Sequence, residues 1–519
     1  MARSYDKQIR RREQGKVPGT APASGASVQP DAGPDAAEPY RTLFVGTLEQ
    51  ESALTVGGSE GFGAVDDPLC RDGAGRYTLR GTGLAGALVA TARRLYGETD
   101  LAAISRSPGS APAADAPLPD SLWRVFTSHP DMPIPRPELR PGVGIRQDTG
   151  AAREGALFDS EVLPRGTKWP FRLEVKTGKP GGAQAEGIAL AALREWEKGY
   201  CWAGANIARG LGWMRLTSLR IYRLKQVPAQ VDCWPDSSRS LTLTLAELSK
   251  VKGVRPFSSD EAKQFGIQVP ERTAAWYYQD LEGSVQVGQA EDDGYGLDGL
   301  AVGGHGTAVL AVRWDGAHML WPDGAQSPQN TEAFDPDFAI ALTRVGPNHW
   351  KPFIPGSSLR GPLRHVLSRH LRSAGNRIRD PLVQTRRPAD EQADPVEDLF
   401  GSLDRNAALL VRDAHLDGDD WRGAWLQQHA EDEFSAGAFS SAKFDRMAVL
   451  RGRFKWRLVV QAATAEELKG RVARLETALN YATQGFMGLG GQQWRGLGWC
   501  RWEITRTVER RAGDHRGQP

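Results

Sequence analysis

Two glycine-rich motifs each occur twice in this chain, far apart and in the same order. Residues 81–86 (GTGLAG) are matched by residues 356–361 (GSSLRG), and residues 204–213 (GANIARGLGW) by residues 490–499 (GGQQWRGLGW). Both offsets are roughly 275 to 285 residues, which is too long for a solenoid period and suits a whole domain. The sequence therefore predicts a duplicated domain with two glycine loops in each copy.

Composition places the chain among globular proteins and gives no direct argument for a partner. Its 519 residues suffice for two to four domains, and its 65 basic and 63 acidic residues leave a net charge of only +2. A site for a polyanion would therefore need a local basic patch. The four cysteines stand singly, without zinc or disulfide spacing, and no apolar run is long enough for a membrane span. A cytoplasmic location without a membrane partner is expected.

Hydrophobic spacing predicts the same order of elements in both copies. Leu359, Leu363 and Val366 share one helical face, and Thr464 with Glu467 forms a capping box that starts another helix. Helices are expected at 84–96, 186–198, 359–371 and 464–482. Strands are expected at 41–47, 171–175, 213–223, 307–314, 454–460 and 499–507. This order predicts an α+β fold with two tandem ferredoxin-like or RNA-recognition-type domains.

The domain boundaries follow from composition and from the extent of the repeats. Residues 1–38, rich in Gly, Ala, Pro and Asp, are expected to form a disordered leader. The first domain is expected at 39–224 and the second at 297–510, with a short tail at 511–519. Residues 225–296 show no clear duplication and are interpreted as the connection between the copies.

The first motif of each copy is a small-residue turn that enters a helix. Gly81, Gly83 and Gly86 also match a dinucleotide-binding fingerprint, with Glu98 or Asp100 as the ribose-binding acid, which would make the chain an NAD-dependent enzyme. The second copy lacks the middle glycine, so the feature that both copies keep is a helix start with free N–H groups suited to phosphate. A plain helix cap is the alternative. The candidate phosphate-binding residues here are Gly81, Thr82, Gly83, Ser357 and Ser358.

Arginines accompany these turns. Arg209 and Arg495 each precede a Gly-Leu-Gly-Trp strand entry, where they would pair with phosphate unless the loops are merely tight hairpins. Arg360 and Arg364 lie on the helix that follows the second turn. Most basic helix faces are simply solvated, but this one begins at a phosphate-suited turn, which favours neutralisation of a nucleic-acid backbone.

Carboxylates precede each turn. Asp66 and Asp67 end a glycine-rich loop in the first copy, and Asp335 and Asp337 precede the second turn. Residues 57–61 (GGSEG) match a serine-hydrolase elbow, but more glycine and a turn follow where that elbow needs a helix. Asp-Pro usually marks only a turn, so the sequence alone assigns these carboxylates no certain chemistry.

These segments, in this order, resemble the RAMP superfamily, specifically the backbone subunits of type III CRISPR effector complexes. Residues 353–364 (FIPGSSLRGPLR) resemble its most specific motif, and residues 56–72 are similar to its active-site loop. Residues 144–167 resemble the stretch leading to its thumb hairpin, and residues 399–402 and 411–414 its mid-domain motif. Because both copies carry the resemblance, the chain is interpreted as two fused subunits.

The resemblance implies a prokaryotic cytoplasm and binding of a guide RNA, a target RNA and other subunits of the complex. It implies that thumbs interrupt the RNA duplex and that Asp66 and Asp335 (Asp337 as the fallback) hold Mg²⁺ or Mn²⁺ and cut the target. The target's own 2′-OH is the nucleophile, so a hydrated ion held by one carboxylate suffices. The expected RNA-binding set also includes Arg165 and Lys168. A guide-RNA scaffold that does not cleave remains the alternative.

Overall fold

The computed structural model describes residues 40–58, 65–97, 121–131, 136–146, 152–224, 255–273, 276–288, 319–320, 340–346, 349–380, 393–431, 435, 437–491, 493 and 496–514. The leader expected at 1–38 and the strand expected at 307–314 lie outside these ranges. Within them, no helix is both long and apolar enough to cross a bilayer.

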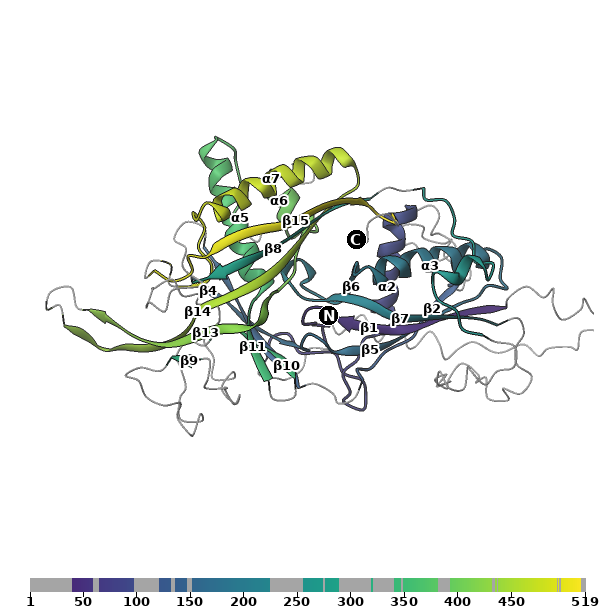
Figure 1. Cartoon of the computed structure of the whole chain (residues 1–519), viewed down its shortest axis with the longest axis horizontal. Coiled ribbons are helices and arrows are strands. Elements are labelled where there is room, and N and C mark those ends of the chain that lie inside the picture. Colours follow the sequence, from purple (N-terminus) through teal and green to yellow (C-terminus); the bar gives the residue numbers. More distant parts are fainter. Residues whose placement is uncertain are drawn as a thin grey trace, which may run out of the picture. The chain divides into compact units, whose positions relative to one another are not determined.

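The first sheet is built around a central strand, β1 (Arg41–Gln50). Its order is β2 (Trp123–Val125), β5 (Lys168–Val175), β1, β7 (Trp213–Leu224) and β6 (Cys201–Trp202), and every pair is antiparallel. Helices α2 (Gly81–Tyr96) and α3 (Gly182–Glu197) lie on one side of it (Figure 1). Phe44 and Leu48 of β1 are fully buried in the core that these helices share with the sheet.

The second sheet repeats this arrangement around β8 (Tyr277–Val287). β8 lies between β14 (Ala438–Ala462) and β15 (Arg501–Arg511), and β12 (Leu409–Val411) pairs with β14, again all antiparallel. Helices α5 (Gly356–Ser373) and α7 (Ala465–Thr483) pack together beside it. The order β15–β8–β14–β12 thus reproduces β7–β1–β5–β2. Two tandem ferredoxin-like α+β domains are confirmed.

Each domain carries a long hairpin inserted before its second helix. In the first domain β3 (Glu138–Ile145) and β4 (Ala152–Val162) form a separate two-stranded sheet, and Ser160 of β4 also bridges to Asp67. In the second, β13 (Ala414–Glu431) pairs with β14, and the far end of this hairpin projects away from α5 and α7 in Figure 1. The remaining elements are β9 (Met319–Leu320), β10 (Leu342–Gly346), β11 (His349–Ile354), α6 (Pro395–Phe400), η2 (Ile207–Arg209) and η3 (Glu261–Lys263).

The duplication extends to individual backbone contacts in the glycine loops. Ala203 N donates to Gly212 O at 3.0 Å, and Leu489 N donates to Gly498 O at 2.8 Å. Gly212 and Gly498 both have positive φ angles, and a Cβ at either would overlap the partner carbonyl. Both positions therefore require glycine, which explains why the motif recurs.

The second sheet begins earlier than the expected domain start at residue 297. β8 lies inside the segment 225–296 that was interpreted as a connection, yet it is an interior strand of the sheet, paired with β14 on one side and β15 on the other. Its sequence, YYQDLEGSVQV, has buried polar side chains, including Gln279, Asp280 and Ser284. Because these replace apolar residues, the usual hydrophobic signature of a central strand is missing.

The sheet pairing also argues against the alternative that the first turn binds a dinucleotide. That fingerprint operates in a parallel βαβ unit, in which the helix connects two parallel strands. Here the sheet beside α2 is antiparallel, with β1 between β5 and β7. Gly81, Gly83 and Gly86 lie on α2, but the surrounding fold does not match a Rossmann domain, and Glu98 and Asp100 lie outside the described residues.

Buried polar contacts join the two domains. The Tyr200 hydroxyl donates to Asp280, which also accepts two hydrogen bonds from Arg457 at 3.1 and 2.9 Å. Arg510 pairs with Glu195 and lies 3.9 Å from the centre of the Tyr200 ring. Tyr200 and Glu195 belong to the first domain and the other three residues to the second, so the domains share a packed seam.

Candidate nucleic-acid interface

The turn that opens α5 lies against the glycine loop of the first domain. Gly356 N donates to the Asp413 carboxylate at 2.8 Å, which satisfies the first N–H of the helix. A Cβ on Gly210 would lie 3.0 Å from the Gly356 Cα, and Gly210 itself has a φ of 108°. Two glycines, one from each domain, are therefore required for this close approach.

Three arginines gather at this turn. Arg360 and Arg364 are one turn apart on α5, and Arg209 reaches them electrostatically from η2 in the first domain. The Arg360 guanidinium donates to the Phe400 carbonyl and lies 5.6 Å from the centre of the Phe400 ring. Among the described residues, the Nε atoms of Arg360 and Arg364 have no hydrogen-bond partner. We call Arg209, Arg360 and Arg364 the arginine cluster.

The electrostatics of the arginine cluster favour an anion. Burial, together with the neighbouring cations Arg364 and Arg209, lowers the pKa of Arg360 to about 9. Burial also lowers the pKa of Arg364, against the opposing effect of Asp394 and Asp380. A bound phosphate would offset the repulsion between these guanidinium groups, and its oxygens could accept hydrogen bonds from the unpaired Nε–H groups.

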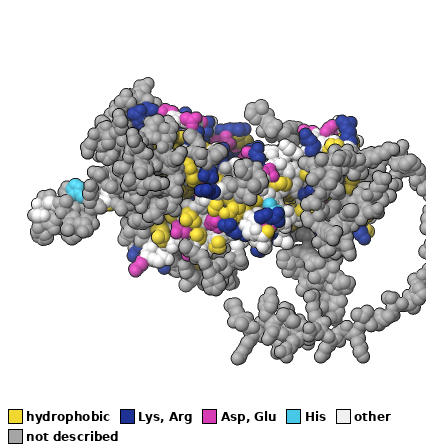
Figure 2. All heavy atoms as spheres, turned by 90° about the horizontal axis from the view of Figure 1, so that it is seen from below, with side chains coloured by type: hydrophobic (Ala, Val, Ile, Leu, Met, Phe, Trp, Pro, Cys, Tyr) yellow, Lys and Arg dark blue, Asp and Glu magenta, His cyan; other side chains and the backbone are white. Residues whose placement is uncertain are grey.

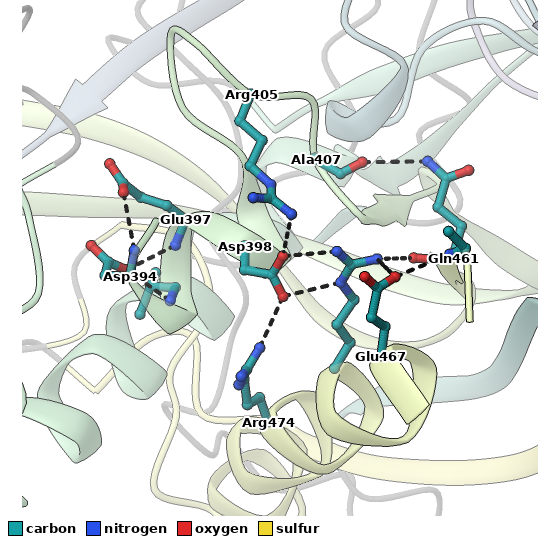
Figure 3. A network of polar contacts seen from close by, with 11 residues as sticks. Asp394, Glu397, Asp398, Arg405, Ala407, Gln461, Glu467 and Arg474 are labelled. Atoms are coloured by element: carbon teal, nitrogen blue, oxygen red, sulfur yellow. Dashed lines mark hydrogen bonds and ion pairs between the residues drawn. The ribbon is translucent and has the colours of Figure 1, made fainter. Parts of the chain in front are cut away.

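Helix α6, which contacts Arg360 through Phe400, is itself held in place by ion pairs. Asp398 of α6 accepts from Arg405 and from Arg471 and Arg474 of α7, at distances from 2.7 to 3.0 Å (Figure 3). These contacts fix α6, whose last residue, Phe400, provides the carbonyl that orients Arg360. These arginines lower the pKa of Asp398, although its burial acts in the opposite direction.

The first domain presents a weaker version of the same turn. Gly81 N donates to the Thr127 hydroxyl at 3.2 Å, and Thr127 occupies the place after β2 that Asp413 occupies after β12. Thr82 and Gly83 are exposed at the start of α2. Ala85 and Val89 stand where α5 has Arg360 and Arg364, so the counterparts of these two arginines are missing, and the cation beside the turn is the exposed N-cap residue Arg80.

The other expected RNA-binding residues lie beside the cluster, apart from it, or outside the described ranges. Arg165 is exposed and acts electrostatically on Arg412 and His415 at the domain seam. Lys168 is exposed at the start of β5. Arg495 lies outside the described residues, as do Asp335 and Asp337. Ser357 is exposed and Ser358 partly exposed at the start of α5, beside the cluster.

The loop that carries Asp66 is clamped to β4. Asp159 N donates to Asp66 Oδ2 at 2.9 Å, and the Ser160 hydroxyl donates to Asp67 Oδ2 at 3.0 Å. Glu161 accepts from the backbone N–H of Leu69 at 2.9 Å and pairs with a nearby arginine. Asp66 remains exposed, so its position is fixed while its carboxylate stays accessible.

A histidine lies near this loop that the sequence did not indicate. His129 Nε2 is 3.0 Å from Asp72 Oδ2, and Asp72 is also held by Arg76 and by the N–H of Ala74. These hydrogen bonds lower the pKa of Asp72 far below its usual range. His129 and Asp72 are far apart in the chain, so no local motif joins them. Asp413 was likewise missed, although it lies within residues 411–414.

The described residues fit a loosely held metal ion and no more. They contain no group of three or more His, Cys, Asp or Glu side chains that could together hold a metal ion. Asp66 and Asp67 are adjacent, exposed carboxylates, each with one oxygen engaged by β4. Such a pair suits a magnesium ion that keeps most of its ligands from water and phosphate.

Positive charge on the surface is local. In Figure 2, dark blue Lys and Arg side chains lie among magenta Asp and Glu and yellow apolar side chains on the face shown. This mixture agrees with a net charge of only +2. A polyanion site would therefore need a local group of basic residues such as the arginine cluster.

Comparison with protein families places these features together. A family model for the RAMP superfamily matches residues 47–215 and 347–501, more than half of the chain. The chain belongs to the RAMP superfamily. The two matched regions correspond to its two ferredoxin-like domains, so the RAMP fold is present twice, and membership supports a CRISPR-associated, RNA-binding role. A comparison with curated proteins finds no match.

Proposed function

We propose that this RAMP protein is a double backbone subunit of a type III CRISPR ribonucleoprotein that binds guide RNA and cuts complementary target RNA. The observation that carries the RNA-binding part is the arginine cluster. Arg360 and Arg364 are partly buried, have unpaired Nε atoms and lie beside a helix N-terminus. A chain of phosphates is the anion that membership of an RNA-binding family favours.

Cleavage is proposed for the Asp66 loop. The protein would hold one target nucleotide in line for attack by its own 2′-OH on the adjacent phosphate. Asp66, with Asp67 beside it, would hold the divalent ion, and Asp335 would act in the second domain. When bound, the ion supplies charge stabilisation at the phosphate. The contacts of β4 with Asp66, Asp67 and Leu69 keep the loop in place during the reaction.

A guide-RNA scaffold without cleavage is the second candidate. It is favoured by the structural use of Asp66 and Asp67, since each carboxylate already holds the loop on β4 through one oxygen. The arginine cluster serves both functions, so RNA binding alone does not separate them.

Mapping of target cleavage separates the two functions. The assembled complex, with Mg²⁺, is given target RNA, and the cuts are mapped at nucleotide resolution for wild type, Asp66→Asn and the distant, exposed control Asp260→Asn. We expect Asp66→Asn to slow one regularly placed cut by on the order of 100-fold and to leave the others intact. An unchanged pattern with normal RNA binding would establish the scaffold function for the first domain.

A further inference from the structure

A continuous set of contacts joins the Asp66 loop to the arginine cluster. Asp67 is held by Ser160 of β4, and Ser160 lies directly opposite Arg140 in the β3–β4 ladder. Arg140 forms an ion pair with Asp413 Oδ2 at 2.8 Å, and Asp413 Oδ1 accepts from Gly356 N. The path therefore leads from the candidate cleavage loop, across the hairpin, to the first residue of α5.

A comparison of the helix-capping residues in the two domains shows the additional contact that Asp413 makes. In the first domain, Thr127 satisfies the N–H of Gly81 with a neutral hydroxyl, so a carboxylate is not needed to cap the turn. Asp413 has a second oxygen, and that oxygen is used by Arg140. Asp413 is fully buried, which raises its pKa, while Arg140 and the Gly356 N–H act in the opposite direction. Asp413 is thus placed to hold two elements at once.

A second contact fixes the same strand on the second domain. Glu138, two residues before Arg140 and opposite Val162 of β4, accepts from Arg344 N in β10 at 2.8 Å. The Arg140 guanidinium also lies 4.6 Å from the centre of the Phe353 ring in β11. The β3–β4 hairpin, which holds the Asp66 loop through β4, is therefore docked on the domain that contains Arg360.

We propose that Arg140 and Asp413 are positioning residues, which hold the Asp66 loop in register with RNA bound at the arginine cluster. This inference rests on the proposed function. Neither residue is assigned a contact with RNA, because Asp413 is fully buried and only 13% of the Arg140 side chain is exposed. Because in-line attack tolerates little misplacement, loss of the pair should reduce the rate of the Asp66-dependent cut more than the affinity for RNA.

The test uses the assembled complex with guide and target RNA. Arg140→Met removes the ion pair, and Arg140→Lys keeps a cation for Asp413. Because a lone buried Asp413 disfavours folding, Arg140→Met with Asp413→Asn provides a second variant that retains an acceptor for Gly356 N. Arg510→Met is the matched control, since it removes another buried arginine–carboxylate pair across the same domain seam, with an equal 13% side-chain exposure.

We expect Arg140→Met and the double variant to lower the single-turnover rate of the Asp66-dependent cut at least tenfold. Guide-RNA affinity and the remaining cuts should stay within threefold of wild type, and Arg140→Lys should restore part of the rate. Wild-type cutting in both variants would overturn the proposal. An equal loss in Arg510→Met would also overturn it, because general loosening of the seam would then explain the result.

Hydrogen exchange keeps this test separate from the proposed function. If wild type makes no Asp66-dependent cut, the proposed cleavage fails, but the positioning role is still decided by exchange in residues 65–72, with and without RNA. We expect faster exchange there in Arg140→Met than in Arg510→Met. Equal exchange in the two variants would overturn the positioning role.

Discussion

At the scale of single residues, the arginine cluster shows how burial changes what an arginine contributes to anion binding. Arg360 and Arg369 lie on the same helix, but Arg369 is exposed to water whereas Arg360 is partly buried beside Phe400. Burial and neighbouring cations lower the pKa of Arg360, so its charged form gains most when a phosphate arrives. A solvated arginine gains little from the same contact.

Replacement of Arg360 and Arg364 by glutamine should weaken RNA binding. We expect the affinity of the complex for guide RNA to fall by about 10- to 100-fold, and the slope of log K against log salt to decrease by roughly 0.7 for each phosphate that is no longer neutralised. Filter binding at several salt concentrations measures both quantities. Arg369→Gln is the control on the same helix, and an equal effect there would point to general charge instead of the cluster.

At the scale of elements, the glycine loop of the first domain and the α5 turn of the second form one structure. Gly210 packs against Gly356, and η2 contacts both α5 and β12. A side chain on Gly210 would overlap Asp413 and push the two domains apart at the arginine cluster.

Gly210→Ala should therefore reduce both stability and RNA affinity. The matched control is Gly75→Ala, because Gly75 also has a positive φ (78°) but has no atom within 4 Å of the added Cβ. The control should lose only about 1–2 kcal/mol of unfolding free energy, the cost of a left-handed backbone. Thermal unfolding and guide-RNA binding compare the two, and equal losses would contradict the close-packing explanation.

Glu138 of β3 makes the stability of the folded protein depend on pH. Burial raises the pKa of Glu138 to about 7, although the N–H of Arg344 and nearby arginines act against it. The folded protein thus binds this proton more tightly than the unfolded chain, and stability falls as pH rises from about 4.5 through 7. Deprotonation of this carboxyl alone would lower the unfolding free energy at pH 8 by about 3 kcal/mol, relative to its value below pH 4.5.

Glu138→Gln imitates the protonated carboxyl and keeps an acceptor for the Arg344 N–H. We expect the variant to unfold at a higher temperature than wild type at pH 8, with little difference at pH 5. Thermal unfolding between pH 5 and 8 measures this difference. A constant difference across that range would show that Glu138 does not titrate there.

At the scale of the whole described chain, a network of buried polar contacts links the two domains. Asp280 binds Arg457 and the Tyr200 hydroxyl, and all three side chains are buried. Asp280 and Arg457 come from neighbouring strands of the second sheet and Tyr200 from the first domain. A change at Asp280 therefore reaches both domains.

Asp280→Ala should lower the unfolding free energy by about 3–5 kcal/mol, because it removes the carboxylate that accepts both hydrogen bonds from the buried Arg457 and leaves only the longer 3.9 Å ion pair with Glu282. Thermal unfolding should also separate into two transitions if this contact couples the domains. Asp420→Ala, which removes an exposed pair with Arg451, should cost under about 1 kcal/mol. Similar losses in both variants would contradict a special role for the seam.

The sequence alone determined the features that are local or repeated. The two glycine loops predicted the duplication because only glycine fits Gly212 and Gly498, and helix periodicity predicted α2, α3, α5 and α7. The same local reasoning placed Arg209, Arg360 and Arg364 near candidate phosphate turns. It missed β8, because a strand whose buried polar side chains are paired across the sheet and seam lacks the hydrophobic pattern that identifies a central strand.

Only the tertiary structure decided which of these residues meet. Arg209 reaches Arg360 because the domains pack with Gly210 against Gly356, a contact between residues far apart in the chain. The link from Ser160 through Arg140 to Asp413 depends on strand register and domain docking in the same way. Such contacts leave no periodic or local signal, since each is fixed by how separate elements pack and not by its own sequence.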